Sequence, residues 1–100
     1  MFGKTTVESL DGSKKFHLVV YILESIVELE GQTVATYGIQ IDKLNLDESE
    51  ILESEKICDI APDKAEIEKL ARELLDGTVE PKNLFEIVSY YVDSPAYLRA

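Results

Sequence analysis

Apolar and polar residues alternate along the first part of the chain in the way that half-buried antiparallel strands require. β-branched and aromatic side chains, which pack well on a pleated sheet, dominate the longest of these segments. The pattern predicts four strands, over Lys4–Leu10, Phe16–Leu29, Thr33–Ile41 and Glu50–Ile57. The first and the last read as edge strands, because they are short or carry charges that discourage aggregation.

The predicted strands are separated by turn signals. Asp11-Gly12-Ser13 and Glu30-Gly31-Gln32 each contain a glycine that can take the positive φ of a tight hairpin, and residues 42–49 form a polar loop. We expect the long strand to bend or bulge near Glu24 and Ser25. A helix over the same segment is the main alternative.

The pattern changes to a helical period after Pro62-Asp63, a favourable helix start. One apolar stripe follows at helical spacing, and Gly77 is placed to end that helix in a left-handed cap. Pro81 then opens a second helix, which Asp93-Ser94-Pro95 ends. The first stripe consists of Ile67, Leu70, Ala71, Leu74 and Leu75, and the second of Leu84, Phe85, Val88, Tyr91 and Val92.

Strands that come first and helices that come last indicate an α+β fold rather than alternating βαβ units. We predict an antiparallel three- to four-stranded meander followed by two antiparallel helices packed on one face of the sheet. Residues 1–100 form a single domain, with a core over about residues 4–93 and a C-terminal tail over 94–100.

Charge and cysteine content narrow the function. With 20 acidic and 10 basic residues the net charge is −10, which opposes nucleic acids and anionic membrane surfaces and leaves a cationic protein as the electrostatically sensible partner. Cys58 is the only cysteine, so no disulfide forms within the chain. The longest apolar run, Phe16 to Leu23, is far shorter than the roughly 20 residues of a membrane span. We expect a cytoplasmic protein without a signal peptide.

The chemistry-bearing residues give no catalytic set. His17 reads as a partly exposed strand residue, and Cys58 as a structural thiol among apolar and anionic neighbours. The acidic segment 42–55 could hold Ca²⁺ or Mg²⁺, although it lacks the EF-hand spacing and a solvated loop is favoured. We expect no enzymatic activity, no cofactor and no metal site.

One face of the sheet predicts an interface. The long strand is apolar on both faces, and two helices cover only one, which leaves Val19, Tyr21 and Leu23, or the residues of the opposite face, in an exposed patch. A homodimer would cover it, and a curled sheet or terminal segments folded over that face are the alternatives. Tyr37-Gly38 is a second candidate contact, because a strand glycine often marks a bulge or a close approach; aromatic packing over the glycine is the alternative.

The order of elements resembles a family of short bacterial proteins that form a domain of unknown function. The resemblance runs from Phe16 to Asp93 and rests on three short motifs. The family carries no assigned activity, substrate or site residue. The motifs are Tyr37-Gly38-Ile39 with Ile41, Asp59-Ile60-Ala61-Pro62, and Pro81 with Leu84 and Val88.

Two functions from different classes are compatible with these observations. The first is a non-enzymatic cytoplasmic interaction or regulatory module with a protein partner or a second copy of itself. The alternative is a small-molecule or divalent-ion binding domain that uses the acidic segment and the region of Tyr37 and Gly38.

Overall fold

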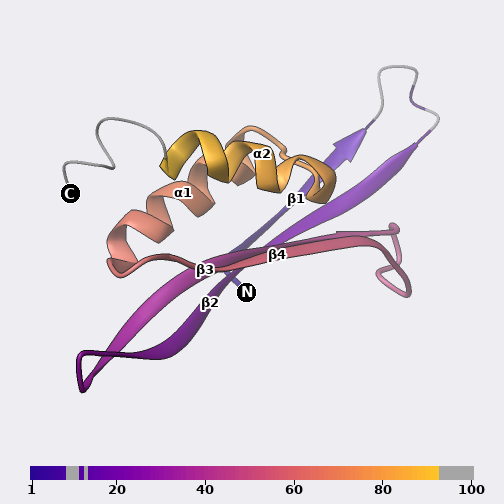
Figure 1. Cartoon of the computed structure of the whole chain (residues 1–100). Coiled ribbons are helices and arrows are strands. Elements are labelled where there is room, and N and C mark those ends of the chain that lie inside the picture. The colour runs from indigo at the N-terminus through magenta and orange to yellow at the C-terminus, as the bar shows by residue number, and fades with distance from the viewer. Residues whose placement is uncertain (9–11, 13, 93–100) are drawn as a thin grey trace.

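Four strands pair in the order in which they follow along the chain (Figure 1). The computed structural model describes residues 1–8, 12 and 14–92. The predicted antiparallel meander, with helices packed on it, is confirmed. The strands are β1 (Gly3–Glu8), β2 (Lys15–Leu29), β3 (Gln32–Leu44) and β4 (Ile51–Ala61), with β1 and β4 at the two edges of the sheet.

β2 and β3 form the longest pairing in the sheet. Their register runs without a shift from His17 opposite Leu44 to Leu29 opposite Gln32, so the bulge predicted near Glu24 and Ser25 is wrong. The helical alternative for this segment is wrong as well. Positive φ angles at Glu30 and Gly31, 51° and 79°, make the two-residue hairpin turn that matches the twist of the strands.

The strand boundaries differ from the prediction mainly at polar positions. β3 continues beyond Ile41 to Leu44, and β4 continues beyond Ile57 to Ala61, because pairing with a neighbouring strand outweighs the low β propensity of Asp and Lys. The predicted turn at Asp11 to Ser13 lies mostly outside the described residues, as does the predicted tail.

The first helix, α1 (Lys64–Asp76), has the predicted apolar stripe. Asp63 caps its N-terminus, and its side chain accepts a hydrogen bond of 2.9 Å from the backbone N–H of Ala65. The five stripe residues predicted from the sequence are all buried. They face the sheet and fix the side on which the helix packs.

The second helix, α2 (Pro81–Val92), buries a narrower stripe than predicted. Pro81, Leu84 and Val88 are buried, whereas Phe85 is 69% exposed, so its assignment to the stripe is wrong. Adjacent helix residues are about 100° apart, which carries Phe85 away from the side on which Leu84 lies. The side chain of Val92 is outside the described part of the chain.

The core lies between the sheet and the two helices. Alternate residues of β2 and β3 point into it, among them Leu18, Val20, Ile39 and Ile41. The Tyr91 hydroxyl of α2 donates a hydrogen bond of 2.8 Å to the Glu66 carboxylate of α1 and so ties the two helices together. Among the described residues, no helix is long and apolar enough to cross a membrane.

The turn between the helices places its left-handed residue one position later than predicted. Gly77 has an ordinary φ of −86°, and Thr78 instead has a φ of 49°. The N–H of Thr78 bonds to the Leu75 carbonyl at 3.1 Å and that of Val79 to the Leu74 carbonyl at 3.0 Å, which is the pattern of a Schellman cap. A β-branched residue in this conformation is strained, because its Cβ crowds the backbone.

Thr78→Gly is expected to raise the free energy of unfolding by about 0.5–1 kcal/mol, since glycine adopts the left-handed conformation without that crowding. Thermal melts followed by circular dichroism measure the change. Thr78→Ala, which keeps a Cβ, is the matched control and should gain less. Equal stability of the two variants would show that the Cβ at this position carries no strain.

Gly38 marks the irregular point of the sheet. Between Tyr37 and Ile39 the pairing of β3 with β4 shifts, because β4 bulges over Gly38. A Cβ built on Gly38 would overlap the Ile57 carbonyl oxygen and lie 2.8 Å from the Cα of Cys58. The sequence predicted a bulge or a close approach here, and the approaching backbone is the chain's own β4.

Gly38→Ala is expected to destabilise the fold by about 1–3 kcal/mol, because the added methyl group meets backbone atoms that cannot rotate away. Urea denaturation followed by circular dichroism would measure the loss. A free energy of unfolding equal to that of the wild type would mean that β4 does not hold this close approach in solution.

Candidate interaction surface

The face of the sheet turned away from the helices carries four of the five predicted interface residues. Alternation along β2 and its register with β3 place Val19, Tyr21, Leu23 and Gly38 on this side, which we call the open face. Tyr37 lies on the helix-covered side, where it packs against the core. Neighbouring strand residues point to opposite faces, so Tyr37 and Gly38 do not share a surface.

Tyr37 is held in its place by the core and by Glu24, its partner across the β2–β3 ladder. Burial, followed by the charge of the Glu24 carboxylate and a hydrogen bond with it, raises the pKa of the Tyr37 hydroxyl. The phenol therefore stays neutral and acts as a packing residue with a polar tip.

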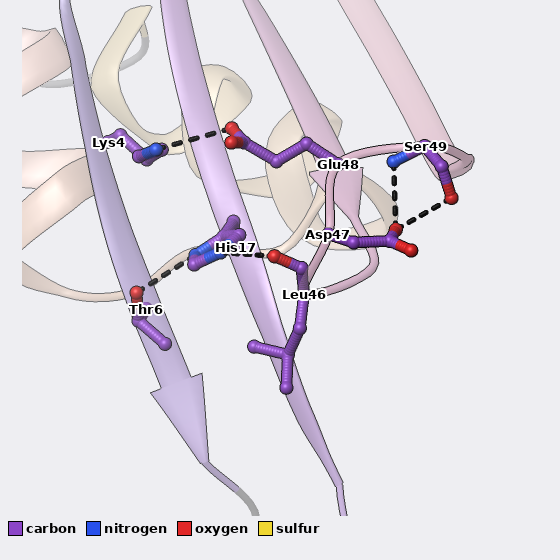
Figure 2. Close-up of polar contacts among 7 residues, drawn as sticks. All are labelled: Lys4, Thr6, His17, Leu46, Asp47, Glu48 and Ser49. Carbon is purple, nitrogen blue, oxygen red and sulfur yellow. Dashed lines mark hydrogen bonds and ion pairs between the residues drawn. The ribbon is translucent and has the colours of Figure 1, made fainter.

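The loop between β3 and β4 folds back toward β1 and β2 across one end of the open face (Figure 2). The His17 ring lies between Thr6 and this loop. Its Nε2 donates to the Leu46 carbonyl at 3.1 Å, and its Nδ1 lies 2.9 Å from the Thr6 hydroxyl. Lys4 of β1 reaches the Glu48 carboxylate at 3.2 Å. The single histidine therefore fastens a loop to two strands.

These contacts explain the burial of Val19. It stands between Lys4 and Asp42 in the sheet register, and only 2% of its surface is exposed. The exposed patch predicted to include Val19 is thus wrong at this residue, because the β3–β4 loop closes over that end of the open face. Tyr21 and Leu23 lie farther along β2 and remain half-buried.

The carboxylates of the acidic segment take separate partners. Asp42 is buried and accepts hydrogen bonds from Gln40 Nε2 at 3.0 Å and from the Ser54 hydroxyl at 2.5 Å. Glu53 pairs with Lys43 at 3.5 Å. Within the described ranges, no three His, Cys, Asp or Glu side chains are placed to share a metal ion.

Asp47 organises the loop itself. Its carboxylate accepts hydrogen bonds from the Ser49 hydroxyl at 2.6 Å and from the Ser49 backbone N–H at 3.0 Å. Both bonds favour the charged carboxylate and lower the pKa of Asp47. The bonds close a local turn, which holds Leu46 and Glu48 where they meet His17 and Lys4.

A second bridge holds the sheet to the start of α2. Lys43 Nζ lies 2.9 Å from the Glu80 carboxylate and 4.3 Å from the centre of the Phe16 ring. The hydrogen bond with Glu80 is the main reason that the pKa of Lys43 is raised. Lys43, Phe16 and Lys15 line an open groove of about 580 Å³ at this end of the sheet.

The other end of the open face lies on a two-stranded extension, which we call the arm and define as residues 21–36. β1 pairs with β2 only as far as Val20, and β4 pairs with β3 only from Tyr37 onward. Between these limits β2 and β3 pair with each other alone and extend beyond the helices (Figure 1). Ile26 and Leu29 of the arm are 64% and 59% exposed.

The open face of the arm carries no charged side chain, although charged residues make up 30% of the chain. Its residues are apolar or neutral polar and continue the surface that begins at Tyr21 and Leu23. From β2 they are Ser25, Val27 and Leu29, and from β3 they are Gln32, Val34 and Thr36.

Sequence reasoning missed the arm beyond Leu23. The signal was present in the strand lengths, because a strand over Lys4–Leu10 is too short to pair with all of Phe16–Leu29. The even positions of Glu24 and Glu28 were a second signal, since alternation places both charges on one face and leaves the other face uncharged.

Asp47→Asn is expected to lower the melting temperature near neutral pH, because the carboxylate bonded to Ser49 is lost. The carboxylate has a lowered pKa, so its contribution is present above the ordinary value of 3.8 and disappears as the pH falls through the folded value. Differential scanning fluorimetry across the acid range should show the two melting curves converging. Glu86→Gln, an exposed acid on α2, controls for the change in net charge. A difference that persists in acid would contradict this account.

Comparisons with known proteins agree with the resemblance noted from the sequence motifs. No curated protein and no solved structure matches the chain. A family model matches residues 2–94, which covers all six elements of the fold. The chain therefore belongs to the DUF6514 family, a family of unknown function.

Proposed function

We propose that this chain is a non-enzymatic interaction module of the cytoplasm, and that it binds a protein partner through the arm. The observation that carries the proposal is the pairing of residues 21–36 of β2 and β3 with each other alone. Among the described residues this leaves their outer edges without a paired strand and one uncharged face open, except at Thr36, which is buried. A regulatory role would follow if the partner were itself an active protein.

Physical reasoning supports binding at the arm. An isolated two-stranded hairpin is at best marginally stable in water, so an extension of this kind contributes little to the core. Unpaired strand edges offer rows of N–H and C=O groups to another chain, and proteins usually shorten or charge such edges. Along β4, the other long edge, Glu53, Glu55 and Lys56 supply such charges. The edge of β2 in the arm carries Glu24 and Glu28 on the helix-covered side only, and its open face carries no charge.

The rest of the described surface favours the same assignment. His17, the one histidine, is engaged by Thr6 and Leu46, and Lys43 by Glu80 and Glu53. These groups have structural tasks that need no substrate. The single cysteine fits the reducing cytoplasm, where disulfides are rare.

Photo-crosslinking in living cells tests the proposal. A photoreactive phenylalanine analogue at Leu29, on the arm, should give a discrete protein adduct whose yield is several-fold higher than that of the same analogue at Phe85 on α2. Both positions are exposed apolar residues, so the pair controls for nonspecific reaction. Equal yields at the two positions, or no adduct at Leu29, would argue against binding through the arm.

A further inference from the structure

The outer edge of β2 beyond Val20, from Tyr21 to Leu29, is not paired with another strand of the described part of the chain. β1 leaves this edge at Gly3, which stands opposite Val20, and no other strand in the described part of the chain occupies it beyond that point. The Val20 carbonyl accepts a hydrogen bond from the Phe2 N–H, so it points toward this edge. Alternation then directs the N–H and C=O groups of Ile22, Glu24, Ile26 and Glu28 outward in the same direction.

The charge pattern along this edge restricts which chain can pair with it. The molecule has a net charge of −10, so a second copy can approach only where like charges are not placed opposite each other. On β2 the acidic residues of the arm are Glu24 and Glu28, and both lie on the helix-covered side of the sheet. The open face of the arm brings no charge to such a contact.

A two-fold axis perpendicular to the sheet leaves the open face of both copies on the same side. It therefore pairs even-numbered residues with even-numbered ones and odd-numbered residues with odd-numbered ones. Each candidate axis thus lies midway between one residue and the same residue of the second copy, and is named by that residue. An axis at Glu24 would set that residue against its own copy, and an axis at Ile26 would set Glu24 against Glu28 of the second copy. Both registers are disfavoured, since like charges directly opposite each other destabilise a sheet.

An axis at Ser25 avoids every such conflict. It sets Glu24 opposite Ile26 of the second copy, and Glu28 opposite Ile22. On the open face it sets Leu23 opposite Val27 and Tyr21 opposite Leu29. An axis at Leu23 or at Val27 leaves part of the edge unpaired. The axis at Val27 also sets Glu24 opposite Glu30 of the second copy. Among these registers the Ser25 axis alone pairs the whole edge without opposing acids.

We infer that the partner of the arm is a second copy of this chain, which adds its β2 antiparallel to the first around a two-fold axis at Ser25 and joins the two sheets into one. This inference rests on the proposed role of the arm and names its partner. The pairing forms about eight backbone hydrogen bonds and brings Tyr21 and Leu23 against apolar residues of the second copy. A two-fold contact also closes on itself, so it ends in a dimer instead of a filament.

The axis makes a geometric prediction about disulfides. Ser25 and its copy form a pair without mutual hydrogen bonds, so their Cα atoms lie about 4.5 Å apart. A disulfide spans Cα separations of about 4.4–6.8 Å, which this pair satisfies. Val27 and its copy are displaced along the strands and lie about 14 Å apart. Val27 instead faces Leu23 of the second copy.

Cysteine crosslinking of the full-length chain tests this register. In a Cys58→Ser background, Ser25→Cys should form a disulfide-linked dimer under mild oxidation with a yield several-fold above that of Val27→Cys. A mixture of Leu23→Cys with Val27→Cys should give the heterodimeric crosslink in preference to either homodimer. Equal yields at residues 25 and 27 would overturn the register.

Charge substitutions test the same pairing without a covalent bond. Light scattering behind size-exclusion chromatography should give twice the mass of one chain for the wild type. Ile26→Glu places acids opposite Glu24 of the second copy and should give a monomer. Ile26→Lys should remain a dimer, and Glu24→Lys added to Ile26→Glu should restore it. Circular dichroism verifies that each variant is folded. Loss of the dimer in both residue-26 variants would point to packing by the exposed Ile26 side chain and would overturn edge pairing.

The outcomes separate this inference from the proposed function. A wild-type mass of one chain across a wide dilution series overturns self-pairing. If the photoreactive residue at Leu29 still captures a different protein in cells, the arm keeps its role as a binding surface and only the identity of the partner is wrong. If it captures neither a second copy nor another protein, both proposals fail.

Discussion

The unbroken antiparallel pairing of β2 with β3 is the interaction on which the other features of this molecule depend. Side chains alternate with a period of two, so a slip of one residue in this ladder would turn the core residues of β2 toward solvent. The observed register places Leu18 and Val20 of β2 on the same side as Ile39 and Ile41 of β3. That surface receives α1 and α2, and the open face follows as its reverse side.

The open face is partly closed by the chain itself, at two places with different chemistry. At one end the β3–β4 loop is fastened by His17 and by the ion pair of Lys4 with Glu48. Near its middle the bulge of β4 covers Gly38, and Thr36 donates a hydrogen bond of 2.6 Å to Asp59. Asp59 itself has a φ of 55°, which an aspartate tolerates better than most residues. Apart from the buried Thr36, the open face of the arm is what these two closures leave uncovered.

The arm follows from a difference in strand length. β2 has 15 residues and β3 has 13, whereas β1 has 6 and β4 has 11, so the central pair extends beyond its neighbours. An extension with one face free of charge is unusual in a chain of net charge −10. Acidic residues elsewhere keep such a protein soluble, and their absence from one surface allows another acidic molecule to approach there. The proposed self-pairing uses this separation of charge.

The amino-acid pattern alone determined the elements and their order. Alternation defined the two faces of β3, the helical period defined the stripe of α1, and a run of strands before helices defined the α+β fold, because each of these follows from the local periodicity of side chains. The same pattern grouped Val19, Tyr21 and Leu23 on one face. It also placed Tyr37 and Gly38 on opposite faces, although both were considered as contacts.

Only the tertiary structure decided which of these surfaces remain exposed. Val19 is buried by contacts with residues distant in sequence, and Gly38 is covered by β4, because a loop and a bulge fold over them. The position of the bulge in β4 and the left-handed residue at Thr78 depend on where two elements meet, which local propensity does not encode. Burial is a property of the assembled layers, and periodicity along one strand states only which residues share a side.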